Sequence, residues 1–254
     1  MALLDRKGVK IFYEVSGAPN DRVPVLLTHG YSATAEMWQP NLEALGVRRR
    51  VITWDIRGHG RSDSPDDLSL YSAELSVADM AAILDAAGVE KAVVGGLSLG
   101  GYLSLEFHLR HPERVAALML FDTGPGFKRD EARAGWNLTA EATAAGYDTR
   151  GLEALPNRPE VGRATHRGAA GLARAARGIL VQQDARVIES LPTIAVPTLV
   201  VVGELDTPFL AATDYMAAKV PGATKAIIPD AGHASNIDQI EAFNRIVLDF
   251  LERV

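Results

Sequence analysis

A serine between two glycines is the residue of this chain best suited to carry out chemistry. Gly96-Leu97-Ser98-Leu99-Gly100 follows an apolar, strand-like run and precedes a helical one. In a sharp turn from strand to helix, the serine hydroxyl stands clear of the sheet. Glycine is needed two residues away on each side, because the two backbones meet there. The pattern predicts that Ser98 is a nucleophile; the alternative is a glycine-rich turn without chemistry.

A serine is a poor nucleophile until a base takes its proton, and that base needs an acid to orient it. Asp206 and His233 each follow a later strand-like run, at the edge where open α/β sheets place their sites. We therefore expect Ser98, Asp206 and His233 to form a catalytic triad. Asp122, at the end of an earlier apolar run, is the alternative acid. If they have no catalytic role, His233 is a histidine of a surface loop and Asp206 is a loop carboxylate or a helix cap.

Acyl transfer also needs backbone N–H groups where the oxyanion develops. Leu99, directly after the serine, can supply one from the start of a helix. The second is expected from Tyr31, in the loop that follows the early strand Val25–Thr28. His29 opens that loop, and we expect it to be structural rather than a second base.

The elements that must position these residues alternate between short β-branched runs and longer helical patterns, which favours a mostly parallel sheet with helices on both faces. The segment 10–16 is more polar and is expected to be an antiparallel edge. Helices are expected over 76–85, 99–109 and 236–251. The expected strands are Val9–Val15, Val25–Thr28, Val51–Trp54, Lys91–Val94, Val115–Phe121, Pro197–Gly203 and Ala226–Ile228.

The segment 128–190 breaks this alternation, since it is rich in alanine, arginine and glycine and has helical spacing without a strand-like run. Some 60 residues would be long for a plain loop. We therefore expect a helical cap at 128–190, inserted in a core made of 1–127 and 191–254.

Composition excludes several classes of function. The chain has 254 residues, a net charge of −6 and no cysteine. An acidic surface argues against nucleic acid and anionic membranes as partners, and the lack of cysteine excludes thiolate chemistry and cysteine-ligated metal. With no visible secretory signal, phosphate loop or dinucleotide motif, we expect a cytoplasmic protein that needs neither cofactor nor metal. The sequence does not indicate an oligomeric state.

These motifs together resemble the α/β-hydrolase fold superfamily over nearly the whole chain. The resemblance implies that Ser98, Asp206 and His233 are the triad, that Tyr31 and Leu99 form the oxyanion hole, and that 128–190 is the cap. The matching pieces are His29-Gly30-Tyr31, Asp55-Ile56-Arg57-Gly58-His59-Gly60-Arg61-Ser62, Gly96-Leu97-Ser98-Leu99-Gly100-Gly101, Gly203-Glu204-Leu205-Asp206 and Gly232-His233.

The sharp turn around Ser98 is called the nucleophile elbow. Within that superfamily, epoxide hydrolases and haloalkane dehalogenases carry aspartate at the elbow, so their reactions are not expected of this chain. The elbow and Leu120-Phe121-Asp122-Thr123-Gly124 look most like small carboxylesterases and 3-oxoadipate enol-lactonases. The loop Tyr31-Ser32-Ala33-Thr34-Ala35 differs from the Asn-Ser-Leu-Gly run of enol-lactonases. The resemblance thus implies hydrolysis of a small ester or lactone without specifying which one.

The pocket and the rival functions complete the expectations. Cap arginines such as Arg163, Arg167 and Arg174 are expected to face solvent rather than substrate. The same triad could instead run a C–C bond hydrolase or lyase reaction, and a ligand receptor on the same fold is a further alternative. Beside Tyr31 and Leu99, the expected pocket residues are Trp38, Phe127, Trp136 and Phe209, with core packing as the competing interpretation.

Overall fold

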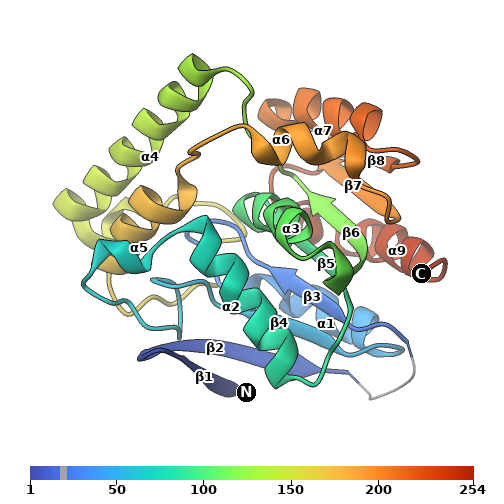
Figure 1. Ribbon diagram of the computed structural model, residues 1–254, viewed down its shortest axis with the longest axis horizontal. Coiled ribbons are helices and arrows are strands. Elements are labelled where there is room, and N and C mark those ends of the chain that lie inside the picture. Colours follow the sequence, from blue (N-terminus) through green and yellow to red (C-terminus); the bar gives the residue numbers. More distant parts are fainter. Residues whose placement is uncertain (18–21) are drawn as a thin grey trace.

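The computed structural model describes residues 1–17 and 22–254. These residues form an eight-stranded sheet in the order β1-β2-β4-β3-β5-β6-β7-β8 (Figure 1). From β4 to β8 all neighbouring strands are parallel, whereas β2 pairs antiparallel with both β1 and β4. The strands are β1 Ala2–Arg6, β2 Val9–Ser16, β3 Val25–Thr28, β4 Val51–Trp54, β5 Ala92–Leu97, β6 Val115–Phe121, β7 Thr198–Gly203 and β8 Thr224–Ile228.

Helices cover both faces of this sheet, as the sequence predicts. On β5, Val94 packs into the apolar cluster under α2, α3 and α6, and its neighbour Val93 packs into the cluster under α1 and α9. The strands β3 to β7 are mostly apolar and nearly every residue in them is buried, because helices cover both faces. The helices are α1 Gln39–Gly46, α2 Ala73–Ala86, α3 Leu99–Arg110, α4 Asp130–Arg150, α5 Ala169–Ala175, α6 Arg186–Ser190, α7 Thr207–Lys219, α8 Ser235–Asp238 and α9 Ile240–Leu251.

The edge of the sheet differs from the prediction. The segment 10–16 is antiparallel, but β1 covers it and forms the edge instead. A two-residue turn joins the two strands, with both Lys7 and Gly8 at positive φ. The residues of β1 are partly exposed, so the run lacks the clear apolar alternation that reveals a strand in sequence.

The C-terminal helix is interrupted where the sequence predicts one helix over 236–251. α8 ends at Asp238, Gln239 leaves the helical region at φ −136° and ψ 64°, and α9 begins at Ile240. In the short helix α8, the side chain of Asp238 accepts a hydrogen bond from the backbone N–H of Gly232 (2.8 Å), next to His233. The single helix predicted over 236–251 is thus two helices that meet at Gln239.

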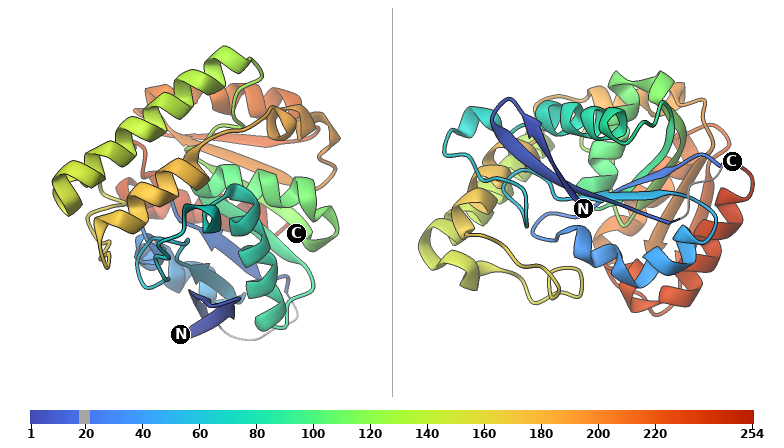
Figure 2. Two further views of the ribbon diagram at one scale, coloured as in Figure 1. Left: turned by 60° about the vertical axis from the view of Figure 1, so that its left-hand side comes forward. Right: turned by 90° about the horizontal axis from the view of Figure 1, so that it is seen from below.

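The helices α4, α5 and α6 lie between β6 and β7 in the chain. The longest of them, α4, lies on the outside of the molecule, and α5 packs along it (Figure 2). The side chain of Tyr147 on α4 packs with Leu172 on α5 in a small apolar cluster of their own. By contrast, α6 packs against α3, with Val187 in the main core. The boundaries 128 and 190 remain a prediction for this cap. Among the described helices, none combines the length and apolar character needed to cross a membrane.

Candidate active site

Ser98 lies at the sharp turn between β5 and α3, with φ 56° and ψ −117°. This backbone conformation is rare for a residue with a side chain, and such strain gathers at functional sites. The turn is held by the N–H of Ser98, which donates to the carbonyl of Phe121 (2.9 Å) on the neighbouring strand. The side chain lines a cavity, so the hydroxyl is presented to a space where a substrate can lie.

Glycines make this turn sterically feasible. A Cβ on Gly96 would come within 2.5 Å of the carbonyl carbon of Gly100, and a Cβ on Gly100 would overlap the carbonyl oxygen of Thr28. A Cβ on Gly101 would lie 2.5 Å from the side chain of Thr123. The expectation that the strand and helix backbones meet here is therefore met.

His233 and Asp206 are brought together as predicted. The imidazole Nδ1 lies 2.8 Å from Oδ2 of Asp206, and both side chains are largely buried. Since a carboxylate only accepts, Nδ1 carries the proton, and this leaves Nε2 of the neutral ring as an acceptor. Phe209, on the first turn of α7, stacks on the imidazole with ring centroids 5.1 Å apart.

The surroundings of His233 act on its pKa in opposing directions. Burial alone lowers it, but the hydrogen bond and charge of Asp206, together with the charges of Asp122 and Glu160, outweigh burial and raise the pKa above 6.5. A raised pKa makes the neutral ring a stronger base. The arrangement therefore suits an imidazole that removes a proton from a hydroxyl.

Asp122, the alternative acid, is bound elsewhere. Its Oδ1 accepts from the N–H of Gly203 (2.8 Å) and its Oδ2 accepts from the hydroxyl of Ser235. The side chain is fully buried, and burial raises the pKa of Asp122 to about 7. Asp122 thus ties β6 to β7 and α8, while Asp206 is the carboxylate that contacts the imidazole.

Two backbone N–H groups remain unpaired beside the serine. Within the described chain, neither Tyr31 nor Leu99 donates its N–H to an acceptor, and Leu99 is the first residue of α3. The loop containing Tyr31 lies against the elbow, because a Cβ on Gly30 would sit 3.5 Å from Cβ of Ser98. These positions match what an oxyanion hole needs, and the assignment of Tyr31 and Leu99 to it stays a prediction.

His29 is a structural residue, as expected. Its Nδ1–H donates to the carbonyl of Gly30 (2.7 Å), and its Nε2 accepts from the N–H of Ile56 (2.9 Å). Burial is the main reason that the pKa of His29 falls to about 4. A neutral, doubly bonded ring cannot act as a base toward substrate, so His29 serves to shape the loop.

Ser32 is a residue that the sequence motifs do not reveal. Its N–H donates to Nε2 of His59 (3.2 Å), its carbonyl accepts from Nε2 of His166 (3.0 Å), and its hydroxyl lies 2.7 Å from the hydroxyl of Tyr147. Tyr147 and His166 come from the cap. Burial lowers the pKa of both His59 and His166, which keeps the rings neutral. The loop with Tyr31 is thereby fixed from both the core and the cap.

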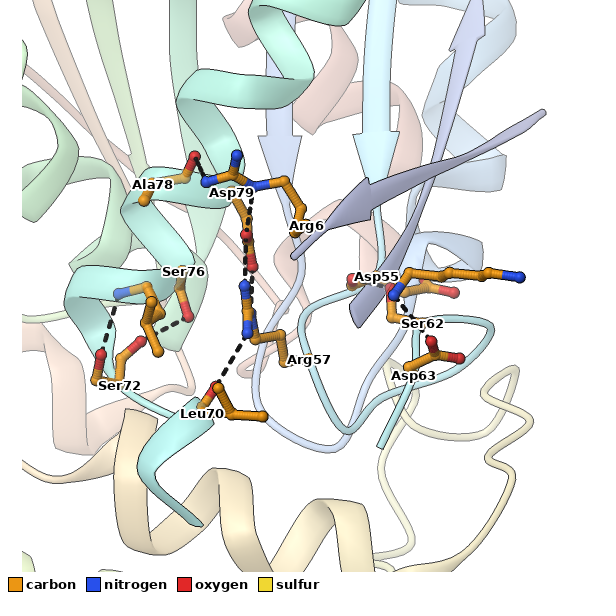
Figure 3. A network of polar contacts seen from close by, with 12 residues as sticks. Arg6, Asp55, Arg57, Ser62, Asp63, Leu70, Ser72, Ser76, Ala78 and Asp79 are labelled. Carbon is orange, nitrogen blue, oxygen red and sulfur yellow. Dashed lines mark hydrogen bonds and ion pairs between the residues drawn. The ribbon is translucent and has the colours of Figure 1, made fainter. Parts of the chain in front are cut away.

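The loop after β4 braces this region through buried charges (Figure 3). Asp55 accepts from the backbone N–H groups of Ala35 (2.8 Å) and Arg61 (2.8 Å). Arg57 pairs with Asp79 of α2 through Nη2 and Oδ1 (2.9 Å), and Arg6 of β1 reaches the same carboxylate. These contacts give the loop a structural role.

The cavity beside Ser98 has a volume of about 150 Å³, close to that of an apolar cavity able to hold benzene. Four of the expected pocket residues line it, namely Leu99, Phe127, Trp136 and Phe209, whereas Tyr31 does not. Trp38 is placed elsewhere: it is fully buried in the core and packs on Phe121 and Phe243. A large aromatic side chain suits a core as well as a pocket, so its type alone does not distinguish the two. The other lining residues are Ser98, Tyr102, Thr123, Gly124, Pro125, Gly126, Leu180, Gln182, Pro208 and Ala212.

Phe209 connects the wall that holds Ser98 with the ring of His233. Ser98 and Phe209 share the wall of the cavity, and Phe209 stacks on His233; no hydrogen bond joins Ser98 to His233 in the part of the chain described. Catalytic hydrogen bonds are often long without substrate. The cap arginines stay outside, since Arg167 pairs with Asp63 and Arg174 with Asp66 on the surface.

Comparison with known proteins now assigns the family. Residues 23–168 match the family described as alpha/beta hydrolase fold. The chain belongs to the alpha/beta hydrolase fold family. A protein provisionally named 2-succinyl-6-hydroxy-2,4-cyclohexadiene-1-carboxylate synthase in Bacillus subtilis is 30% identical, with 93% of each chain covered. The 3-oxoadipate enol-lactonase 1 of Acinetobacter baylyi is 28% identical over 99% of this chain and 97% of its own.

The fold of this alpha/beta hydrolase also matches solved structures. A thermophilic esterase from Thermogutta terrifontis, solved with malate bound, superposes with a TM-score of 0.81 at 27% identity. The match covers 99% of this chain and 96% of the esterase. The relatives therefore include proteins named for lactone and ester hydrolysis, and these cover nearly the whole alpha/beta hydrolase chain.

Proposed function

We propose that this alpha/beta hydrolase cleaves a small carboxylic ester or lactone through Ser98, His233 and Asp206. The observation that carries the proposal is the bond between Nδ1 of His233 and Asp206 (2.8 Å) next to a strained elbow serine. That bond fixes the tautomer in which Nε2 is free to accept a proton. The relatives named as an enol-lactonase and an esterase support the reaction class.

The reaction proceeds in two halves. Ser98 Oγ attacks the ester carbonyl as its proton passes to Nε2 of His233, and the N–H groups of Tyr31 and Leu99 stabilise the oxyanion. His233 then protonates the leaving alkoxide, which departs and leaves an acyl group on Ser98. In the second half, water attacks this acyl group, His233 takes the water's proton and returns it to Ser98, and the carboxylic acid is released.

The roles of the remaining groups follow from their positions. Asp206 holds the imidazole and stabilises its charged form, whereas Asp122 retains a structural role in this proposal. The cap at 128–190 covers the cavity and selects the substrate. The chain uses no metal or cofactor for this reaction, and its partner is the small substrate rather than nucleic acid or a membrane.

The test is hydrolysis of p-nitrophenyl acetate, butyrate and octanoate by the wild-type protein and by Ser98→Ala. We expect turnover that Ser98→Ala abolishes. Butyrate should exceed octanoate in kcat/KM, because a cavity of about 150 Å³ holds roughly six carbons. Equal turnover by both proteins would exclude Ser98 as the nucleophile. Absence of turnover with all three esters would favour a reaction of the kind for which the Bacillus subtilis relative is named, that of a synthase.

A further inference from the structure

One polar side chain in the cavity wall has an unused donor. Gln182 is 8% exposed and lines the cavity with Ser98. Its Oε1 accepts from the backbone N–H of Phe127 (3.1 Å). Because an N–H must face an oxygen, this bond fixes the orientation of the amide and leaves its NH₂ group at the other end. Within the described chain, that NH₂ group has no acceptor.

The position of Gln182 is set by a dense group of contacts. Asn137 of α4 accepts from the backbone N–H of Gln182 (2.8 Å) and donates to its carbonyl (2.9 Å). Trp136 Nε1 donates to the carbonyl of Leu180 (2.7 Å), two residues earlier. A Cβ on Gly126, at φ +88°, would lie 2.8 Å from the amide oxygen. The amide is therefore held in place before any substrate arrives.

The cavity has no positive charge to offer an anion. Among the described residues that line it, none is lysine, arginine or histidine. Three arginines of the cap are paired elsewhere: Arg133 with Asp130, Arg177 with Glu141 and Asp148, and Arg186 with Asp184. Lys128 and Arg129, which follow Phe127, are exposed to solvent and do not line the cavity. A carboxylate placed in the cavity would lose its hydration without gaining an ion pair. For an uncharged oxygen, one hydrogen bond from the cavity wall compensates for the lost hydration.

We infer that Gln182 binds an uncharged oxygen acceptor of the substrate, so that the preferred ester or lactone carries a distal ketone, ether or hydroxyl oxygen and no carboxylate. This inference rests on the proposed function for the site at which it acts. The donor is the amide NH₂ of Gln182, and the group that it binds occupies the cavity beside Ser98. Gln182 is thus a specificity-determining residue and takes no part in bond making.

Two matched substrate pairs test the inference by kcat/KM. On the acyl side, p-nitrophenyl 4-oxopentanoate is compared with p-nitrophenyl pentanoate. On the alcohol side, 2-methoxyethyl acetate is compared with butyl acetate. Gln182→Leu should lower the ratio of the oxygenated to the plain substrate roughly five- to tenfold in at least one pair, the worth of one hydrogen bond. Differences in intrinsic reactivity are common to all variants and cancel.

Matched variants separate recognition from packing. Gln183→Leu changes the exposed neighbour, which faces a different hollow, and should leave both ratios unchanged. Gln182→Glu keeps an acceptor for Phe127 but has no donor when ionised, so at pH 9 its ratios should match those of Gln182→Leu. Ratios that stay at the wild-type level in Gln182→Leu, or that Gln182→Glu restores, would overturn the inference.

A substrate that carries a carboxylate tests the prediction that the cavity disfavours a negative charge. The p-nitrophenyl monoester of succinate resembles the 4-oxopentanoate ester in length but ends in a carboxylate. We expect its kcat/KM to be at least tenfold lower in the wild-type protein, since desolvation of the carboxylate is uncompensated. A monoester that reacts as fast as the ketone ester, or faster, contradicts the assignment of a neutral substrate.

Failure of the proposed function is distinguishable from failure of this inference. If no ester or lactone is turned over, the binding of cyclohexanone, a neutral ring with one acceptor, is measured by NMR titration. Weaker binding by Gln182→Leu, with wild-type binding by Gln183→Leu, would uphold the role of Gln182 without hydrolysis. Equal binding by all three proteins would reject that role.

Discussion

At the scale of single residues, two aspartates lie near His233 and their surroundings give them different tasks. Asp206 meets the imidazole at 2.8 Å, whereas Asp122 accepts from Gly203 and Ser235 and is fully buried. A carboxylate that orients histidine must contact Nδ1. The geometry therefore favours Asp206 as the orienting acid and Asp122 as a brace between strands.

Replacement of Asp206 by asparagine should lower kcat by about four orders of magnitude, because an amide can donate to Nδ1 and favour the wrong tautomer. Asp122→Asn is the matched control, since its amide oxygen still accepts from Gly203 and its effect on kcat should be less than about tenfold. Steady-state kinetics with p-nitrophenyl butyrate measures both. A small effect at Asp206 with a large one at Asp122 would reverse the two roles.

The pH dependence of kcat/KM should report the ionisation of His233. Only the neutral ring can accept a proton, so activity rises with pH as His233 deprotonates. Because Asp206 and the nearby carboxylates outweigh burial, the pKa is raised and the midpoint should lie above 6.5. In Asp206→Asn the midpoint should move to lower pH. A flat profile between about pH 5 and 9 would contradict the role of His233 as general base.

At the scale of elements, the turn from β5 to α3 depends on how closely α3 approaches its neighbours. The first turn of α3 contacts the end of β3 so closely that Gly100 has no room for a Cβ beside the Thr28 carbonyl. The positive φ of Ser98 is maintained by this packing. Strain at one residue is thus compensated by contacts of whole elements.

Two glycine-to-alanine changes should therefore have opposite effects on stability. Gly100→Ala forces α3 away from β3 and should reduce the free energy of unfolding by roughly 3 kcal/mol or more. Gly135→Ala lies in α4 with nothing within 4 Å of the new Cβ, and should raise it by about 0.5–1 kcal/mol. Chemical denaturation followed by circular dichroism measures both changes. A Gly100→Ala protein as stable as the wild type would refute the steric argument.

At the scale of the whole molecule, the cap is joined to the core through the loop that carries Tyr31. Ser32 contacts both Tyr147 and His166 of the cap, and the hydroxyl of Tyr31 donates to the carbonyl of Leu172 (2.8 Å). His166 also accepts from the N–H of Gly60 (3.1 Å). Loosening of the cap must therefore disturb the predicted oxyanion loop as well.

The substitution His166→Ala should loosen the cap and the loop with Tyr31 together. Loss of its bonds to Ser32 and Gly60 should cost about 1–3 kcal/mol of stability and speed amide exchange in both the cap and the loop 30–34. The value of kcat should fall with it, because the oxyanion loop is less well fixed. Hydrogen exchange by mass spectrometry, with exposed Arg163→Ala as control, checks the effect. Faster exchange confined to the cap would show that the two parts are independent.

Much of this architecture could be predicted because its signals are local. The continuous apolar run Val115–Phe121 marks a strand with both faces buried, and the glycines around Ser98 mark the elbow. The edge strand β1 was missed because it is short and partly exposed. Trp38 was misplaced because a buried tryptophan has the same sequence context in a core as in a pocket.

The parts that escaped prediction depend on contacts between distant segments. Ser32 and His166 are 134 positions apart, and no motif links the two. Gln182 has no signature either, because its NH₂ group is left without an acceptor only once the amide oxygen accepts from Phe127. The spacing of residue types along the sequence predicts turns and periodic elements. It does not predict which buried donor lacks an acceptor in the folded protein.

The crowding around Gly96, Gly100 and Gly101 has a consequence for how natural variation in such proteins is read. A population selected only to fold would keep these glycines, because any side chain there collides with Thr28, Thr123 or the opposing backbone. A descendant that lost its reaction but kept its shape would preserve the same three glycines. Retention of the three glycines therefore indicates that the turn is kept, whereas the reaction is indicated by Ser98, Asp206 and His233 themselves.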